Sequence, residues 1–311
     1  MDLRAIDLRR PYLQSIFSIR YTVLNSCRKF LGDEGFIEVN TPKIIATATE
    51  GGATLFPIFY YDREAFLTQS PQLYKEQLTM AFENVFEIGP IFRAEPSRTN
   101  RHLSEATSID IEKAYADYND IMEILERMIH FLWDVVKNNN KSQLEYLKIE
   151  IPDISFPFRR YRYSDLIEKL QGAGESIEWG DDISQQKLRN LNDEDMKNFY
   201  FIFDWPTSIK PFYVKPKSTG TECESFDLMY DTLELSSGST RIHDKNELTE
   251  RMKKQGLSTD AFDFHLKVFD YGMPPHAGFG LGLERLMMSM CGVDNIRDVV
   301  LFPRDIDRLS P

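Results

Sequence analysis

The sequence predicts an α+β protein, built on a mainly antiparallel β-sheet with helices packed beside it. Two alternating segments, "NVFEIGPIFRAE" and "TSIDIEKAY", follow one another with only a polar loop between them. A second pair of short strands is expected in "FDLMYDTLELSSGSTR", and the helical patterns lie apart from these strands. Strands that follow strands indicate an antiparallel sheet, whereas regular alternation of strands and helices indicates a parallel one.

The N-terminal part predicts a helix, a short strand and a loop. Apolar residues between Leu13 and Leu31 recur at spacings of three, four and seven, which is typical of an amphipathic helix that ends at the "GDEG" turn. The segment "FIEVNTPKII" alternates and is then interrupted by Pro42, which indicates a short strand. The small and polar "ATATEGGATLFP" has the composition of a loop.

The next two strands are predicted to form an antiparallel hairpin. One of its faces would be apolar, and the other would carry Glu87, Arg93, Asp110 and Glu112. Strands favour β-branched and aromatic residues, so this many charges on one face indicates a chemical role.

The rest of the chain predicts a long helix over 118–137, a loop over 137–143, a small helical insertion at about 156–191 and a buried strand in "FYFIFDWP". Near the end, "HAGFGLGLERL" matches neither the dinucleotide fingerprint nor the phosphate loop. Its alternating glycines indicate a strand whose bare face lies against a flat ligand or another backbone. A helix then begins near Gly282, which places Arg285 in its first turn, where the helix dipole favours an anion.

Composition limits the classes of protein that remain. The 311 residues, 42% hydrophobic and 28% charged, suit one folded domain with at most a small insertion. The three widely spaced cysteines predict no disulfide framework and no zinc site, and therefore a cytoplasmic protein. The start has no signal-peptide pattern, and no run is long enough to span a membrane. A net charge of −12 gives no general attraction for nucleic acid, so contact with RNA requires a local patch.

Three segments, in order, carry a family resemblance. "GFIEVNTPKI", "FEIGPIFRAEPSRTNRHLSEATSIDIE" and "GFGLGLERLMM" are similar to motifs 1, 2 and 3 of the class II aminoacyl-tRNA synthetases. From about residue 5 to Pro311 the chain resembles their catalytic domain, most closely the archaeal and eukaryotic type of aspartyl enzyme. The resemblance implies one catalytic domain over residues 1–311, with a six- to seven-stranded, mainly antiparallel sheet flanked by helices. The anticodon-binding OB domain that precedes it in the family is expected to be absent, as in a stand-alone paralogue or an excised catalytic domain.

The resemblance also implies an ATP site with Mg²⁺. Arg93 would hold the α-phosphate and the substrate carboxylate, and Arg285 the terminal phosphates, as the two catalytic residues. Asp227 and Glu234 would hold Mg²⁺, which prefers one or two carboxylates together with phosphates and water. The expected ATP contacts are Arg93, Glu95, Arg101, His102, Leu103, Glu234, Gly282 and Arg285.

For the amino acid, the resemblance implies that Lys75 and Arg241 clamp the side-chain carboxylate of L-aspartate. Two cations around one small acid would disfavour neutral asparagine, because charge would remain unpaired in a buried site. The expected aspartate contacts are Glu50, Ser70, Gln72, Lys75, Asp110, Ser237 and Arg241.

The implied reaction is attack of the aspartate α-carboxylate on the α-phosphorus of ATP, which gives aspartyl-adenylate and pyrophosphate, followed by transfer to tRNA. An aspartate-activating paralogue that passes the adenylate to ammonia or another small acceptor is the alternative, and a non-catalytic regulatory paralogue is less favoured. Arg98 and Arg101 offer local positive charge for a tRNA acceptor end. The family implies a homodimer formed through motif 1, and no membrane partner is expected.

Overall fold

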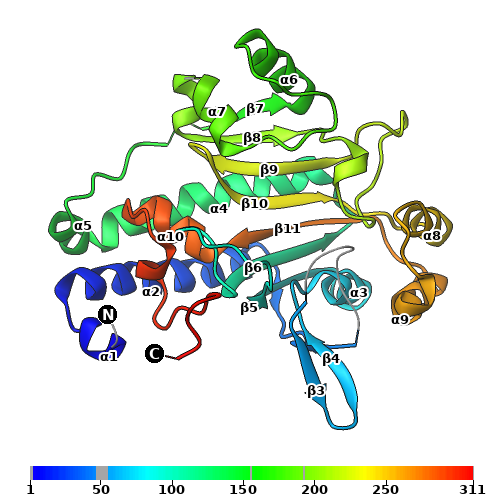
Figure 1. Cartoon of the computed structure of the whole chain (residues 1–311), viewed down its shortest axis with the longest axis horizontal. Helices are drawn as coiled ribbons and strands as arrows, with labels where there is room; N and C mark the ends of the chain where they lie inside the picture. The colour runs from blue at the N-terminus through cyan, green and yellow to red at the C-terminus, as the bar shows by residue number, and fades with distance from the viewer. Residues whose placement is uncertain (1–2, 47–54, 155, 192, 311) are drawn as a thin grey trace.

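The computed structural model describes residues 3–46, 55–154, 156–191 and 193–310. Within these residues, eight strands form one sheet in the order β1-β5-β6-β11-β10-β9-β8-β7, and three form a small sheet in the order β2-β4-β3 (Figure 1). The strands are β1 (Ile37–Glu38), β2 (Ile44–Ile45), β3 (Pro57–Tyr60), β4 (Arg63–Leu67), β5 (Asn84–Phe92), β6 (Glu105–Ala114), β7 (Arg159–Arg162), β8 (Phe199–Phe203), β9 (Ser225–Tyr230), β10 (Leu233–Thr240) and β11 (His276–Gly282).

The predicted fold class is confirmed, and the predicted number of strands is slightly low. Every pair in the middle of the large sheet is antiparallel, while β1–β5 and β7–β8, at its two edges, are parallel. The two edge strands account for the difference from six or seven. Strand β1 lies within the strand predicted in "FIEVNTPKII", whereas β7 falls in the predicted helical insertion, and its four residues are too few for a periodic pattern to be visible.

The helices pack around the large sheet. They are α1 (Arg4–Asp7), α2 (Pro11–Asp33), α3 (Gln72–Phe82), α4 (Tyr118–Asn139), α5 (Lys141–Leu147), α6 (Tyr163–Gly172), α7 (Gln185–Leu191), α8 (Lys245–Lys254), α9 (Asp263–Leu266) and α10 (Leu283–Cys291). The 156–191 segment contains α6 and α7, but it also contains β7, which joins it to the large sheet. The loop predicted over 137–143 is wrong, because α4 continues to Asn139 and α5 begins at Lys141.

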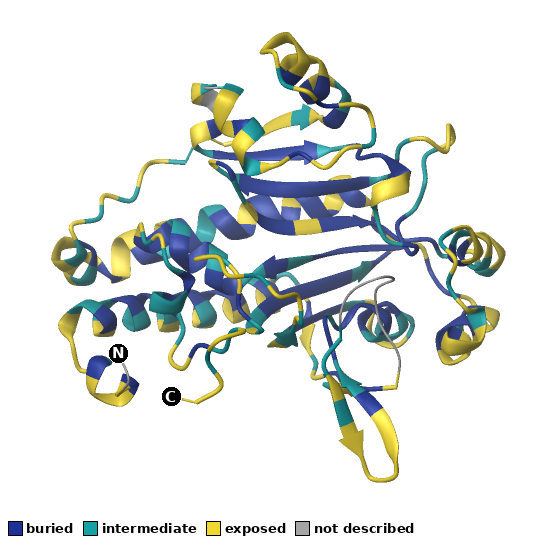
Figure 2. Ribbon diagram, in the orientation of Figure 1, coloured by how far each residue is buried: buried dark blue, intermediate teal, exposed yellow. Residues whose placement is uncertain are grey.

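Two apolar clusters cover the two faces of the sheet. One joins the strands to α2, α4 and α10, and the other joins them to α6, α8 and the segments around α9. Strand β8 contributes to both, because Phe201 faces the first cluster while Tyr200 and Ile202 face the second. The central strands are accordingly almost wholly buried (Figure 2). No helix in the described part of the chain is long and apolar enough to cross a membrane.

The predicted motif 2 hairpin is confirmed, with Glu87 opposite Asp110 and Val85 opposite Glu112. All three acids are buried, at 3%, 4% and 0% exposure respectively. Glu87 is ion-paired to Lys43 at 2.6 Å and accepts a hydrogen bond from the Thr41 hydroxyl at 2.6 Å. Buried charges need such partners, and so the charged face of the hairpin is an internal polar layer.

Candidate active site

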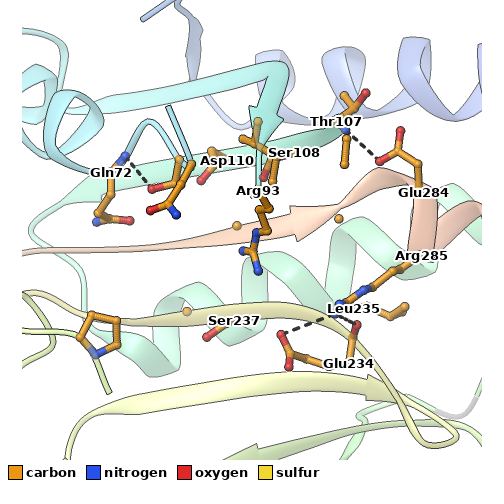
Figure 3. A pocket seen from close by; sticks show the side chains of 18 of the residues that line it. Gln72, Arg93, Thr107, Ser108, Asp110, Glu234, Leu235, Ser237, Glu284 and Arg285 are labelled. Carbon is orange, nitrogen blue, oxygen red and sulfur yellow. Dashed lines mark hydrogen bonds and ion pairs between the residues drawn. The ribbon is translucent and has the colours of Figure 1, made fainter. Parts of the chain in front are cut away.

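A pocket of about 270 Å³ lies over the centre of the large sheet, between its polar face and the loop that joins β5 to β6 (Figure 3). The pocket is lined by side chains from strands β6, β10 and β11, from the start of α10 and from the loop before α3. Among its lining residues are the predicted Ser70, Gln72, Arg93, Arg101, His102, Leu103, Asp110, Glu234, Ser237, Gly282, Arg241 and Arg285. Segments far apart in the sequence thus meet at one place.

Four predicted site residues are not brought into this pocket. Glu95 lines a smaller adjoining cavity together with Arg93. Lys75 and Asp227 lie in the layer behind the pocket wall. Glu50 lies outside the residues that the structure describes.

One end of the pocket is rich in arginine. The Arg93 guanidinium points into the space, and Arg285 approaches from α10 on the other side (Figure 3). Arg285 Nη1 donates a hydrogen bond to the Glu234 backbone carbonyl at 2.9 Å. Burial and the positive charges of Arg285 and Arg93 lower the pKa of His102, so its imidazole is neutral at neutral pH. This end suits a polyanion, because forked guanidinium groups bind phosphate oxygens in pairs.

The two predicted metal-binding acids lie on the same face of neighbouring strands. Asp227 pairs with Ser237, and Glu234 pairs with Met229, which is two residues from Asp227. A β-bulge at position 235 makes this possible, because the extra residue resets the alternation of side chains in β10. Glu234 and Ser237, three residues apart, therefore both face the pocket.

A lysine that the sequence analysis did not single out occupies this corner. Lys210 Nζ donates to both carboxylate oxygens of Asp227, at 2.8 and 3.0 Å, and lies 4.4 Å from the centre of the Trp205 ring. Glu234 is half exposed to the open pocket, but the atoms packed around it displace much of the water. This burial and the nearby Asp227 charge raise the pKa of Glu234. A site where an ammonium group is already paired with a carboxylate is electrostatically suited to a cation.

The opposite end of the pocket contains a network of buried ion pairs. Arg241, 3% exposed, donates to Glu112 at 2.9 and 3.3 Å and to the Ser239 hydroxyl at 2.6 Å. Lys75 Nζ lies 2.9 Å from Asp110 Oδ1 and 3.4 Å from Glu112 Oε2. Arg241 borders the pocket, whereas Lys75 is beneath it and borders the space only through Asp110. Of the two cations predicted to clamp aspartate, Arg241 therefore lines the pocket. Lys75 lies beneath the pocket wall and pairs with Asp110, which lines it.

The glycine strand β11 has two different functions along its length. A Cβ atom at Gly278 would collide with the Ile111 carbonyl and the Glu112 carboxylate, so that glycine permits close packing of strands. At Gly280 it would lie 3.1 Å from Asp110 Oδ1, and Gly280 and Gly282 both border the pocket. The glycine face of β11 therefore packs against Glu112 of the ion-pair network at Gly278, and it forms part of the pocket wall at Gly280 and Gly282.

Replacing Gly278 by alanine is expected to lower the free energy of unfolding by about 1–3 kcal/mol, because the methyl group must displace the strand or Glu112. Urea unfolding followed by circular dichroism measures this change. Gly282→Ala is the matched control, since the nearest atom to its added Cβ is 3.7 Å away. Equal losses in the two variants would contradict the packing role.

The loop between β5 and β6 is held by the C-terminal segment, another feature not predicted. The Ser104 amide donates to the Arg304 carbonyl at 2.8 Å, and the Ile296 amide donates to the Asn100 carbonyl at 2.8 Å. Glu284, at the base of the pocket, accepts from Arg20 at 2.8 Å and from the Thr107 amide at 2.9 Å. These contacts join segments that are remote in sequence, and the local sequence pattern of each segment does not predict them.

Comparison with known proteins identifies similar chains. Residues 1–306 match the family described as tRNA synthetases class II (D, K and N). The chain is 53% identical over 315 residues to the aspartate–tRNA(Asp/Asn) ligase of Archaeoglobus fulgidus, an alignment that covers 100% of this chain and 73% of the relative. It is 50% identical over 309 residues to the ligase of the same name from Sulfurisphaera tokodaii, covering 99% and 72%.

Solved structures give the same result. The asparaginyl-tRNA synthetase of Pyrococcus horikoshii, in complex with asparaginyl-adenylate, superposes with a TM-score of 0.95 at 34% identity, covering 100% of this chain and 73% of that one. The aspartyl-tRNA synthetase of Entamoeba histolytica superposes with a TM-score of 0.88 at 34% identity, covering 100% and 62%.

Proposed function

The chain belongs to the class II tRNA synthetases of the D, K and N group, and on that basis we propose that it activates L-aspartate with ATP and transfers it to tRNA. The observation that carries this proposal is the division of one pocket into two ends. Arg285 and Glu234 lie at one end, Gln72 and Asp110 lie at the other, and Arg93 points into the space between them (Figure 3). A polyphosphate and a small acid would thereby be held side by side.

In the proposed reaction, an oxygen of the aspartate α-carboxylate attacks the α-phosphorus of ATP. A new O–P bond forms, the bond to the bridging oxygen breaks, and pyrophosphate leaves. Arg93 stabilises the negative charge that develops on the α-phosphate, and Arg285 binds the departing phosphates. The buried residues around Arg241 orient the amino acid, so that positioning and charge neutralisation supply the catalysis.

Asp227 and Glu234 are the residues that we propose to hold Mg²⁺. Their carboxylates share a sheet face, and the ammonium of Lys210 already lies against Asp227. Bound Mg²⁺ would supply positive charge to neutralise the triphosphate. Lys210 would then turn from Asp227 toward the phosphates.

Acidification is expected to weaken Mg²⁺ activation. Because its surroundings raise the pKa of Glu234, this carboxyl takes up a proton at a higher pH than an ordinary glutamate does. A protonated carboxyl does not ligate Mg²⁺. The Mg²⁺ concentration that gives half-maximal pyrophosphate exchange should therefore rise as the pH falls through this raised pKa. Glu234→Gln should need more Mg²⁺ at every pH and lose this dependence. The same dependence in Glu234→Gln as in the original chain would refute the assignment.

For the acceptor, we propose the 3′ end of tRNA, because the relatives named above are ligases of tRNA(Asp/Asn). Arg98, 72% exposed on the β5–β6 loop, is paired with Asp307 at 3.1 Å, and a phosphate of the acceptor end would take the place of that carboxylate. The whole chain then acts as one catalytic domain in the cytoplasm, where ATP and tRNA occur together.

We also propose a homodimer. Ile37 and Ile44 in the motif 1 region are each 48% exposed, and Phe59 at the end of the protruding β3–β4 hairpin is fully exposed. Exposed apolar groups of this kind are typical of an interface. Sedimentation equilibrium at micromolar protein should give twice the 36.3 kDa mass of the chain, and a monomeric mass would count against the dimer.

The deciding experiment combines two assays on the same preparation. Aspartate-dependent exchange of labelled pyrophosphate into ATP reports adenylate formation, and acid-precipitable labelled aspartate on tRNA(Asp) or tRNA(Asn) transcripts reports transfer. Both activities are expected. Exchange without transfer would redirect the proposal to a small acceptor, with ammonia tested next by formation of asparagine. Absence of exchange with aspartate would overturn the proposed function.

A further inference from the structure

A buried polar cluster lies directly behind the amino-acid end of the pocket. It consists of Glu76, His265 and His276, each 0% exposed, and it reaches the pocket through Gln72, which is 4% exposed. The mechanism above uses none of the first three residues. In the sequence the histidines are far apart and have no motif, yet the fold places both against the same carboxylate.

The contacts define the charge of the cluster. His265 Nε2 lies 3.2 Å and His276 Nε2 lies 3.8 Å from Glu76 Oε2. Gln77 donates its amide hydrogen to His265 Nδ1 at 3.1 Å, so the ring proton of His265 lies on Nε2, facing Glu76. Burial alone would raise the pKa of Glu76, but the two imidazoles outweigh it and hold that pKa well below the usual range. Glu76 is therefore a carboxylate, which can only accept hydrogen bonds.

The second oxygen of Glu76 reaches the pocket wall. Gln72 Nε2 donates to Glu76 Oε1 at 2.6 Å, a short, charge-assisted bond. A carboxamide free to rotate could present either its nitrogen or its oxygen to a ligand. Because Glu76 accepts only, it retains the nitrogen and leaves Oε1 of Gln72 as the group available to the ligand.

His276 connects this cluster to the other wall of the same end. Its backbone carbonyl accepts a hydrogen bond from the Arg241 amide at 2.9 Å, and its Nδ1 lies 2.8 Å from the Pro274 carbonyl. The cluster is therefore joined to Gln72 on one wall of the amino-acid end and to the backbone of Arg241 on the other. These contacts limit the movement of Glu76.

We propose that Glu76 is a positioning residue that fixes the carboxamide of Gln72, so that its oxygen accepts a hydrogen bond from the ammonium group of the amino-acid substrate. This inference rests on the proposed activation of aspartate and deepens it. Glu76 itself does not touch substrate. Its effect is expected on the binding of the amino acid, because its contact with the pocket is through Gln72, whereas Arg285 lies at the other end (Figure 3).

The test is a double-mutant cycle read by aspartate-dependent pyrophosphate exchange. Glu76→Gln, which is nearly isosteric, should raise the KM for aspartate about tenfold to a hundredfold, since one charge-assisted hydrogen bond no longer orients the amide. The KM for ATP should stay within about twofold, because the phosphate end keeps its contacts. Gln72→Ala should raise the KM for aspartate at least as much, and the double variant should be no worse than Gln72→Ala alone.

Two further variants separate positioning from stability. Glu126→Gln removes another buried carboxylate, which is 2% exposed and accepts a hydrogen bond from the Phe158 amide. Glu126 does not line the pocket. It should lower the thermal midpoint without changing the KM for aspartate. Glu76→Asp keeps a charge between the histidines but withdraws it from Gln72 by one methylene, so it should reproduce the KM effect even if Glu76→Gln fails to fold.

The outcomes distinguish this inference from the function on which it rests. No exchange by the original chain would overturn both. Exchange by the original chain, with the KM for aspartate unchanged in folded Glu76→Gln or Glu76→Asp, would overturn the positioning role alone. Additive effects in the double variant would also overturn it, because Glu76 would then act independently of Gln72.

Discussion

Arg93→Ala is expected to lower kcat/KM for aspartate-dependent pyrophosphate exchange by about a hundredfold to a thousandfold, the cost of removing a group that stabilises charge in the transition state. The guanidinium points into the centre of the pocket (Figure 3), where it lies between the two proposed substrates. Its loss should therefore affect both substrates and the step between them. Initial rates of exchange at varied ATP and aspartate measure the effect.

Arg28→Ala is a suitable control for this experiment. Arg28 is 43% exposed on α2 and pairs with Glu38 at 3.0 Å, away from the pocket. An exposed pair of this kind contributes about 0–1 kcal/mol to stability, so the variant should fold and exchange normally. A loss below about threefold in folded Arg93→Ala would be too small for transition-state stabilisation and would remove Arg93 from the mechanism.

Arg241→Met is expected to lower the free energy of unfolding by about 3–5 kcal/mol, because it leaves the Glu112 carboxylate buried without its main partner. Burial alone would lower the pKa of Arg241, but Glu112 outweighs it and raises that pKa, so the guanidinium is charged. Loss of the guanidinium at the amino-acid end should also raise the KM for aspartate. Urea unfolding and exchange kinetics measure the two effects separately.

A comparison with Arg127→Met isolates the contribution of burial. Arg127 is 44% exposed and donates two hydrogen bonds to Glu34, whose side chain is 30% exposed. Removing this exposed pair should cost about 1 kcal/mol or less. If the two variants are equally stable, the ion pair of Arg241 does not behave as a buried one, and the proposed network is wrong.

Alternation and composition predicted the strands that pair directly along the chain. In β5–β6, Ile109 and Ile111 enter the apolar core while Asp110 and Glu112 enter the polar layer, as their two-residue period requires. The family, predicted from three ordered motifs, is confirmed as well. Local pattern placed a strand where β1 lies but missed β7, whose four residues are too few to be periodic.

The contacts within the site could be predicted from the sequence less well than the strands, because tertiary packing determines them. Lys75 is on α3, and only tertiary packing determines that its amine lies among Asp110, Glu112 and two carbonyls. Lys210 lies in a loop whose sequence resembles any surface turn, and its contact with Asp227 joins this loop to strand β9. Glu76 has no motif at all, since its partners lie about 190 and 200 residues further along the chain.

The bulge at position 235 has a consequence for how this strand tolerates insertions and deletions. Glu234 and the serine three residues later serve the two ends of the pocket only because one extra residue separates their pleats. Deleting Leu235 would remove the bulge and leave Glu234 opposite Met229 in a regular strand, with its side chain on the same face as that serine. In protein engineering, position 235 is therefore where this strand can lose one residue without reversing the side chains on either side, because residue 235 has no partner in β9.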